Sequence, residues 1–242
     1  MLLLVPFVPM QPQFLSSSQA RRLQKAAKRC RTRVKLGKPW IKWSDEELWR
    51  KVLGQIAVVG RAEPGERLQH DPKIRRKISI KRLKRFQTDT EMQKHLHEVF
   101  VSLGVRYVGR NWKTDKKAAA GVKNFRKLMK DGGPKQFFAK IAKYGTESER
   151  IKDLQESLKY YGDKGSRDTL IELRLAENCM ALDARIYGVL EGVGVKASPA
   201  DIFRHVENEL IRKVAEPLGI SGARLDRILF QNYKAILKAL EG

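Results

Sequence analysis

A short polar turn at residues 162–165, with the sequence Gly-Asp-Lys-Gly, joins two apolar segments that suit α-helices. Asp183 lies 19 positions after Lys164, at the start of a further helical segment. A helix–hairpin–helix followed by one more helix can bring two such positions face to face across a cleft. The sequence therefore predicts a helical hairpin at about 158–170, with Lys164 and Asp183 opposed.

The rest of the chain is predicted to be mainly helical as well. Residues 44–47, Ser-Asp-Glu-Glu, form a capping box that places acidic side chains at the positive end of a helix. Apolar residues follow at helical spacing up to Gly60, and a loop is expected over 61–65. An alternating pattern typical of strands occurs only near 76–80 and 105–109. We predict an all-α fold, with further helices within 16–38 and over 90–104, 112–131, 134–144, 147–161, 184–191, 200–215 and 223–240.

The length of 242 residues allows one large core or two small packed lobes. We expect a basic N-terminal extension over 1–42 and a helical domain over 43–242. The domain should consist of two lobes with a cleft between them.

The chain is strongly basic, because 50 Lys and Arg oppose 27 Asp and Glu and give a net charge of +23. Such a field favours polyanions, and nucleic acid is the first candidate. A lysine-rich thermophilic or ribosome-associated protein would have a similar balance. Residues 73–85 hold eight Lys or Arg in thirteen positions and present a cationic face either as a strand or as an amphipathic helix. This segment is predicted to contact backbone phosphates, whereas 16–38 is either a phosphate-contacting arm or a solvated tail.

Cysteine and histidine are too scarce to indicate a cofactor. The two cysteines, Cys30 and Cys179, predict neither a disulfide framework nor a four-cysteine iron–sulfur cluster. The four histidines show no metal-ligand spacing, so no metal is expected. The apolar start, residues 1–10, is too short to span a bilayer and lacks the basic region of a signal peptide. We expect an intracellular protein of the cytoplasm or nucleoid that has no membrane anchor.

The hairpin resembles that of the helix–hairpin–helix DNA glycosylase superfamily, whose motif reads approximately L-x-G-x-G-x-K-x-[AST]. Leu158, Gly162, Lys164 and Ser166 match the motif, whereas Tyr160 replaces its first glycine. The segment 182–186, Leu-Asp-Ala-Arg-Ile, is also similar to the superfamily. The resemblance extends over about 44–240, is specific over 158–190, and is strongest to the 8-oxoguanine glycosylase/AP lyase branch.

This resemblance implies a catalytic pair. Lys164 would attack C1′ of a flipped nucleoside as a neutral amine and form a Schiff base, while Asp183 would stabilise the positive charge that develops at C1′. Gly162, Gly165 and Ser166 would bind a DNA phosphate through the hairpin. Taken singly, Lys164 could instead be a surface lysine in a turn, and Asp183 the N-cap of helix 184–191.

Three further positions are predicted by the resemblance. Arg61, following Gly60, would enter the duplex as a wedge; the alternative is a surface arginine after a C-cap glycine. Asp226 and Phe230, four positions apart on a helix, would hydrogen-bond the edge of the damaged base and stack on its face. The alternative for this pair is a surface Asp and an ordinary core Phe.

The predicted function is that of a bifunctional DNA glycosylase with AP lyase activity. Its partner would be double-stranded DNA that contains a damaged base, and we expect a monomer without cofactors. Because the chain lacks the cysteines of the iron–sulfur branch, which includes many enzymes for pyrimidine lesions, 8-oxoguanine is the favoured lesion. Two alternatives stay open: a non-catalytic basic nucleic-acid-binding protein, and a monofunctional glycosylase that uses water and Asp183.

Overall fold

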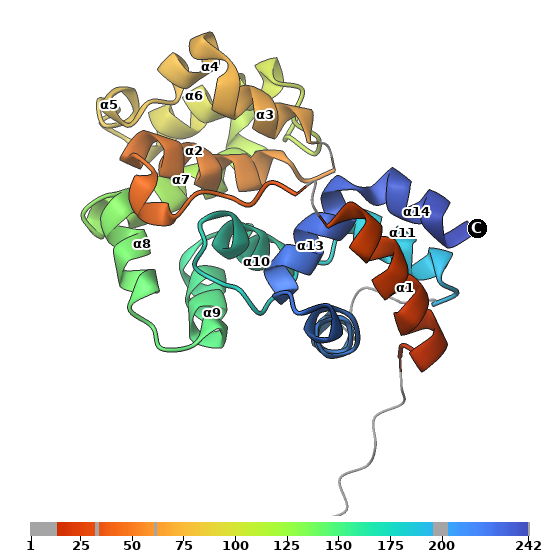
Figure 1. Ribbon diagram of the computed structural model, residues 1–242. Helices are drawn as coiled ribbons and strands as arrows, with labels where there is room; N and C mark the ends of the chain where they lie inside the picture. The colour runs from red at the N-terminus through yellow and green to blue at the C-terminus, as the bar shows by residue number, and fades with distance from the viewer. Residues whose placement is uncertain (1–13, 32–33, 61, 196–202, 242) are drawn as a thin grey trace, which may run out of the picture. The chain divides into compact units, whose positions relative to one another are not determined.

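The computed structural model describes residues 14–31, 34–60, 62–195 and 203–241. Every regular element in these ranges is a helix and no strand occurs among them, so the all-α prediction is confirmed (Figure 1). No helix within these ranges combines the length and the apolar character that crossing a membrane requires. The two alternating stretches are not strands: residues 76–77 end a helix, and 105–109 are irregular.

The chain divides into two units. Unit 1 contains the described parts of 1–35 and 182–242, and unit 2 contains 36–181. This division differs from the predicted boundary after residue 42, because the N-terminal helix buries its apolar side in unit 1. The predicted cleft between two lobes stays a prediction.

Unit 2 is organised around its first long helix, α2. This helix packs against α3, α7 and α8, while α6 packs on α7 and α9 on α10. Trp49 of α2 and Phe125 of α7 meet edge to face with ring centroids 5.1 Å apart, and both are fully buried. The elements are η1 (Trp40–Lys42), α2 (Asp45–Ala57), α3 (Glu63–His70), α4 (Pro72–Lys77), α5 (Ile80–Leu83), α6 (Asp89–Ser102), η2 (Trp112–Thr114), α7 (Lys116–Lys130), α8 (Pro134–Ala142), α9 (Glu147–Ser157) and α10 (Asp163–Glu172).

Several predictions in this unit were wrong in detail. The helix expected over 147–161 ends at Ser157, and the one expected over 112–131 is divided into η2 and α7. The expected loop over 61–65 is wrong from Glu63 onwards, because α3 begins there with Pro64 in its first turn, where a missing N–H costs nothing. The basic segment 73–85 is neither one strand nor one helix. It contains all of α4 except Pro72 and all of α5, and the Ser79 side chain caps α5 by accepting a hydrogen bond from the Arg82 amide.

Unit 1 combines the N-terminal helix with the C-terminal part of the chain. Helix α1 packs on α13 and α14, and α11 packs on the same two helices. Gly188 permits this approach, because a Cβ there would lie 2.8 Å from the Tyr233 hydroxyl. The elements are α1 (Ser17–Cys30), α11 (Ala184–Gly192), α12 (Phe203–Leu210), the π-helical turn η3 (Ile211–Ala215), η4 (Glu216–Leu218), α13 (Gly222–Gln231) and α14 (Tyr233–Glu241).

The single helix predicted over 223–240 is wrong, because the chain bends at Asn232. This residue leaves the helical conformation, and its side-chain amide donates to the Ile228 carbonyl at 3.1 Å. Asparagine side chains compete in this way with the regular helical hydrogen bonds. The bend separates α13 from α14, which both contact α1 and α11.

The capping box at the start of α2 is confirmed. The Ser44 hydroxyl accepts from the Glu47 amide at 3.3 Å, and the Glu47 carboxylate accepts from the Ser44 amide at 2.8 Å. Lys38 also donates to Glu47 at 2.7 Å. These bonds, first that from Lys38 and then that from the Ser44 amide, lower the pKa of Glu47 to about 2.

This shift predicts that Glu47 makes folding stability depend on pH. The folded pKa of Glu47 lies below its unfolded value of about 4.3, so its carboxylate stabilises the fold above about pH 5 and loses that effect as the pH falls towards 2. Glu47→Gln keeps the geometry of the capping box and removes the charge. In urea unfolding, the wild type should exceed Glu47→Gln in stability at neutral pH, and the difference should shrink on acidification. A constant difference, or an equal pH-dependent difference for Glu66→Gln on the exposed side of α3, would contradict this assignment.

Candidate active site

The hairpin between α9 and α10 is held in place at both of its sides. Leu158 and Tyr161 are buried and anchor it to the core of unit 2. The side chain of Asn124 in α7 donates to the Lys159 carbonyl at 3.0 Å and accepts from the Lys159 amide at 2.7 Å. This two-way amide contact fixes the backbone of the turn, and nothing in the sequence near the hairpin indicated it.

Tyr160, at the position of the first glycine of the motif, adopts a backbone conformation that glycine favours. Its φ is 65°, in the left-handed region that glycine adopts readily and that costs other residues roughly 1–2 kcal/mol. Its side chain is partly exposed. The turn at position 160 therefore has the left-handed conformation for which glycine is the usual residue.

Helix α10 begins without a side-chain cap. Its N-cap is Gly162, and a Cβ placed there would meet no atom within 4 Å. No side chain among the described residues caps the first amides of the helix, and the space beside Gly162 is open, an arrangement that suits a phosphate. The three predicted phosphate-binding positions lie at this end of α10, as Gly162, Gly165 and Ser166.

Gly165 and Ser166 have structural contacts of their own. A Cβ on Gly165 would lie 2.5 Å from the Gln55 amide nitrogen, so this glycine permits close packing of α10 on α2. Ser166 is fully buried and donates to the Gly162 carbonyl at 2.9 Å. Their contact with DNA stays a prediction.

Lys164 projects from the first turn of α10 and is 39% exposed. Its ammonium lies 3.7 Å from the Asp168 carboxylate, one helical turn later. Asp168 also pairs with the half-buried Lys51 of α2 at 3.5 Å, and Lys51 in turn pairs with Glu172. Burial by itself would lower the pKa of Lys51, but Asp168 and Glu172 raise it overall. Lys51 is thus a permanent cation that shares Asp168 with Lys164.

Asp183 is the N-cap of α11 in unit 1. Its Oδ1 accepts from the amides of Arg185 and Ile186 at 3.0 and 3.1 Å, so the helix-capping interpretation is confirmed. Among the described residues, Oδ2 accepts no hydrogen bond, and the side chain is half-buried. Capping therefore orients the carboxylate and leaves one oxygen available. The opposition of Lys164 and Asp183 across a cleft stays a prediction.

The two predicted base-pocket residues, Asp226 and Phe230, lie on α13. Their burial differs from that expected of a surface Asp and an ordinary core Phe. Asp226 is 1% exposed, with Arg227 at 3.6 Å, so it is not a surface aspartate. Phe230 is only partly buried, and the Arg185 guanidinium lies 4.4 Å from the centre of its ring. A base stacking on that face of Phe230 would have to displace Arg185, two positions after Asp183.

The predicted wedge, Arg61, lies outside the described residues. Gly60 has a φ of 85°, and a Cβ there would lie 3.1 Å from the ring of Tyr107. Tyr107 is 76% exposed and has a left-handed φ of 59°. The structure thus places an exposed aromatic side chain beside Gly60, a neighbour that is 47 positions away in the sequence and carried no recognisable signal there.

A buried polar group close to the hairpin was also missed. His97, to which the sequence analysis gave no role, lies 2.9 Å from Asp115, the buried N-cap of α7. Lys117 is 2% exposed, and its amine makes no hydrogen bond within the described part of the chain. Burial lowers the pKa of Lys117, and Asp115 only partly opposes this. Burial raises the pKa of Tyr160, and the negative charge of Asp115 raises it further. The cluster of His97, Asp115 and Lys117 is therefore electrostatically linked to the turn.

The left-handed turn predicts an unusual order of stabilities at position 160. Tyr160→Ala keeps a Cβ in the left-handed region, whereas Tyr160→Gly removes it, so the glycine variant should be more stable than the alanine variant by about 1 kcal/mol. Urea unfolding of the two variants measures this difference. At the exposed neighbour Lys159, where no positive φ occurs, alanine should be the more stable substitution. If alanine were equal or superior to glycine at 160, the turn would differ from the one described.

Comparisons by sequence identify no relatives, since no family model matches the chain and no curated protein is significantly similar to it. Solved structures do match. The 8-oxoguanine DNA glycosylase of Methanocaldococcus jannaschii superposes with a TM-score of 0.61 at 17% identity, over 88% of this chain and 92% of that one. The same enzyme in complex with a 15mer DNA containing 8-oxoguanine gives 0.58 at 16% identity, over 88% and 94%.

A bacterial enzyme matches equally well. The 8-oxoguanine DNA glycosylase of Thermotoga maritima gives a TM-score of 0.58 at 18% identity, over 88% of this chain and 93% of that one. Similarity at this level of identity concerns the fold, and it covers nearly the whole length of each enzyme. The chain therefore has the all-α fold of the 8-oxoguanine DNA glycosylases.

Proposed function

We propose that this protein is a base-excision repair DNA glycosylase with AP lyase activity, acting on 8-oxoguanine in double-stranded DNA. The observation that carries the proposal is the position of Lys164, in the first turn of an uncapped hairpin helix on a glycosylase fold. A second observation supports it, since Asp183 keeps a carboxylate oxygen available at the start of α11. The complex of a protein with this fold and a 15mer DNA containing 8-oxoguanine supports DNA as the partner.

In the proposed reaction the neutral amine of Lys164 attacks C1′ of the flipped nucleotide. The bond from C1′ to the base breaks, and the base leaves with the bonding electrons and acquires a proton. Opening of the sugar ring then gives a protonated Schiff base between Nζ and C1′. Loss of a proton from C2′ expels the 3′ phosphate and nicks the strand. Asp183 would stabilise the positive charge that develops at C1′.

The neighbours of Lys164 suit this role. Asp168 holds the lysine at its place in the first turn of α10 by an i,i+4 contact. A carboxylate with no other partner would favour the charged ammonium, which cannot attack. Lys51 pairs with the same carboxylate and also with Glu172, so it compensates the negative charge of Asp168 only in part. The contacts among Lys51, Asp168 and Lys164 thus fix the place of Lys164 in the first turn of α10.

The same hairpin would also supply part of the surface that binds DNA. The uncapped amides of α10 would hold a phosphate of the lesion strand, and the net charge of +23 would attract the duplex. A non-catalytic nucleic-acid-binding protein would need the cationic surface but no lysine at this position. A monofunctional glycosylase would use Asp183 with water and release the base without nicking the strand.

The test is borohydride trapping on a set of duplexes carrying 8-oxoguanine, thymine glycol, uracil or 3-methyladenine. The wild type should form a covalent adduct and a nick with 8-oxoguanine. Lys164→Gln should lower both by at least about a hundredfold, because the nucleophile is lost. Lys159→Gln removes the same charge from the adjacent turn and should react like the wild type.

The outcomes separate the alternatives. Undiminished trapping by Lys164→Gln would assign the nucleophile to another amine. Base release without adduct or nick would indicate the monofunctional mechanism, and duplex binding without base release would indicate a binding protein. Reaction with thymine glycol but not with 8-oxoguanine would overturn the lesion assignment alone. One hydrogen bond to the lesion, worth about 1–3 kcal/mol, corresponds to roughly a ten- to hundredfold preference over guanine.

A further inference from the structure

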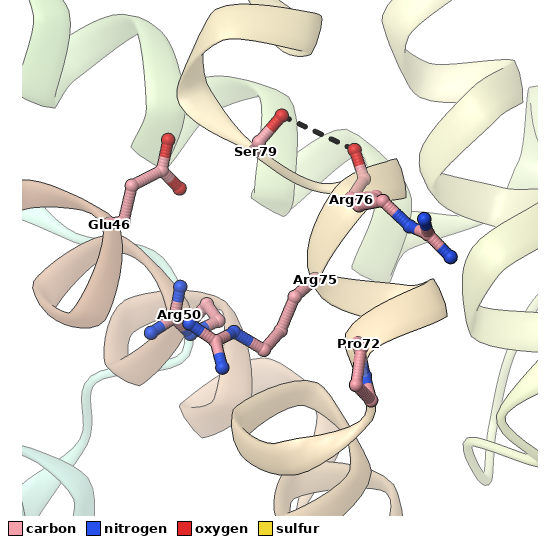
Figure 2. Close-up of a pocket in the computed structure, with 6 residues that line it drawn as sticks. All are labelled: Glu46, Arg50, Pro72, Arg75, Arg76 and Ser79. Atoms are coloured by element: carbon pink, nitrogen blue, oxygen red, sulfur yellow. Dashed lines mark hydrogen bonds between the residues drawn. The ribbon is translucent and has the colours of Figure 1, made fainter.

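Unit 2 contains a pocket of about 470 Å³ that the glycosylase chemistry does not use (Figure 2). It lies between the N-terminal half of α2 and the α4–α5 segment. The residues that line it are Glu46, Arg50, Pro72, Arg75, Arg76 and Ser79. Three arginines thus oppose one glutamate, so the pocket is strongly cationic.

The single acidic side chain is already engaged. Glu46 accepts a hydrogen bond from the Ile80 amide at 2.9 Å and so joins α2 to the start of α5. The Ser79 hydroxyl donates to the Arg76 carbonyl at 3.2 Å, shown by the dashed line in Figure 2. Within the described ranges, none of the three arginine side chains forms an ion pair or a hydrogen bond at the distances that define one.

Arg50 is the most informative of the three. It is only 5% exposed, and its buried Nε has no hydrogen-bond partner among the described residues. Burial lowers the pKa of Arg50, and the positive charge of Arg75 lowers it further, against the opposing effect of Glu46. A buried charged donor without a partner destabilises a protein, and an anion would satisfy it. In Figure 2 the Arg75 side chain extends towards Arg50, whereas that of Arg76 turns away.

This pocket is separate from the hairpin. Lys51 and Gln55 of α2 contact Asp168 and Gly165 of α10, whereas Glu46 and Arg50 line the pocket. At about 100° per residue, the two pairs of α2 side chains point roughly 140° apart around the helix. An anion held by Arg50 would therefore lie on a different side of α2 from the phosphate expected at α10.

We infer that Arg50 and Arg75 form a second phosphate-binding site in unit 2. Guanidinium groups bind phosphate oxygens with paired hydrogen bonds, and the pocket exceeds the size of one phosphate group. Two sources share this chemistry: a backbone phosphate of duplex DNA beyond the hairpin, and a free polyphosphate compound. The site does not depend on Lys164 or on the proposed glycosylase reaction.

Isothermal titration with inorganic pyrophosphate at constant ionic strength tests the site. The wild type should bind one pyrophosphate, and Arg50→Met and Arg75→Gln should each weaken binding by at least about tenfold. Arg82→Gln removes the same charge from an exposed position on α5 and should bind like the wild type. Lys164→Gln should also bind normally, which separates this site from the glycosylase proposal.

Two further measurements make the outcomes decisive. Thermal unfolding without ligand shows whether Arg50→Met is folded, and added pyrophosphate should raise the midpoint of the wild type more than that of either pocket variant. Displacement of pyrophosphate by a lesion-free duplex identifies backbone phosphate as the source, and retention identifies a free polyphosphate. The inference is overturned if pyrophosphate does not bind, or if it binds both folded pocket variants as tightly as it binds Arg82→Gln.

Discussion

The ion pairs of the half-buried Lys51 connect the hairpin to the core of unit 2. Lys51 projects from α2 and pairs with two carboxylates of α10, Asp168 and Glu172. A few residues along α2, Gln55 packs against Gly165 so closely that a Cβ at position 165 would force the Gln55 side chain to move. Removing one partner of an ion pair that is shielded from water leaves the other charge uncompensated. The orientation of α10, and with it the position of Lys164, therefore depends on this contact.

Helix α2 contributes charged side chains to two separate sites of unit 2. Towards α10 its Lys51 pairs with Asp168, the carboxylate that contacts the candidate nucleophile Lys164. On another side, beside Arg75 and Arg76, the buried Nε of its Arg50 has no hydrogen-bond partner among the described residues. Helix α2 therefore supports the proposed chemistry through Lys51, whose charge is paired, and the proposed phosphate site through Arg50, whose Nε lacks a hydrogen bond among the described residues. At low dielectric an unpaired buried polar group is costly, so Arg50 rather than Lys51 favours a bound ligand.

Local signals in the sequence predicted much of the fold. The capping box at Ser44 and the end of α6 before Gly104 depend on neighbouring residues, and both are present. The bend at Asn232 was missed because the apolar pattern continues through it. In the site, the motif identified Lys164 and Asp183 as candidates, and capping by Asp183 was foreseeable. Partners such as Asn124 and Lys51 were not foreseeable, because only the tertiary structure brings them near the hairpin.

The central claim is that Lys164, held by Asp168 and Lys51, is the amine that becomes bonded to DNA. Peptide mass mapping of the borohydride-reduced adduct with an 8-oxoguanine duplex tests it most directly. We predict that the sugar-derived mass increment lies on Lys164. The strongest rival within the described residues is Lys117, a buried amine whose pKa burial lowers. An increment on Lys117 or Lys159, or a trapped adduct with unmodified Lys164, would contradict the claim.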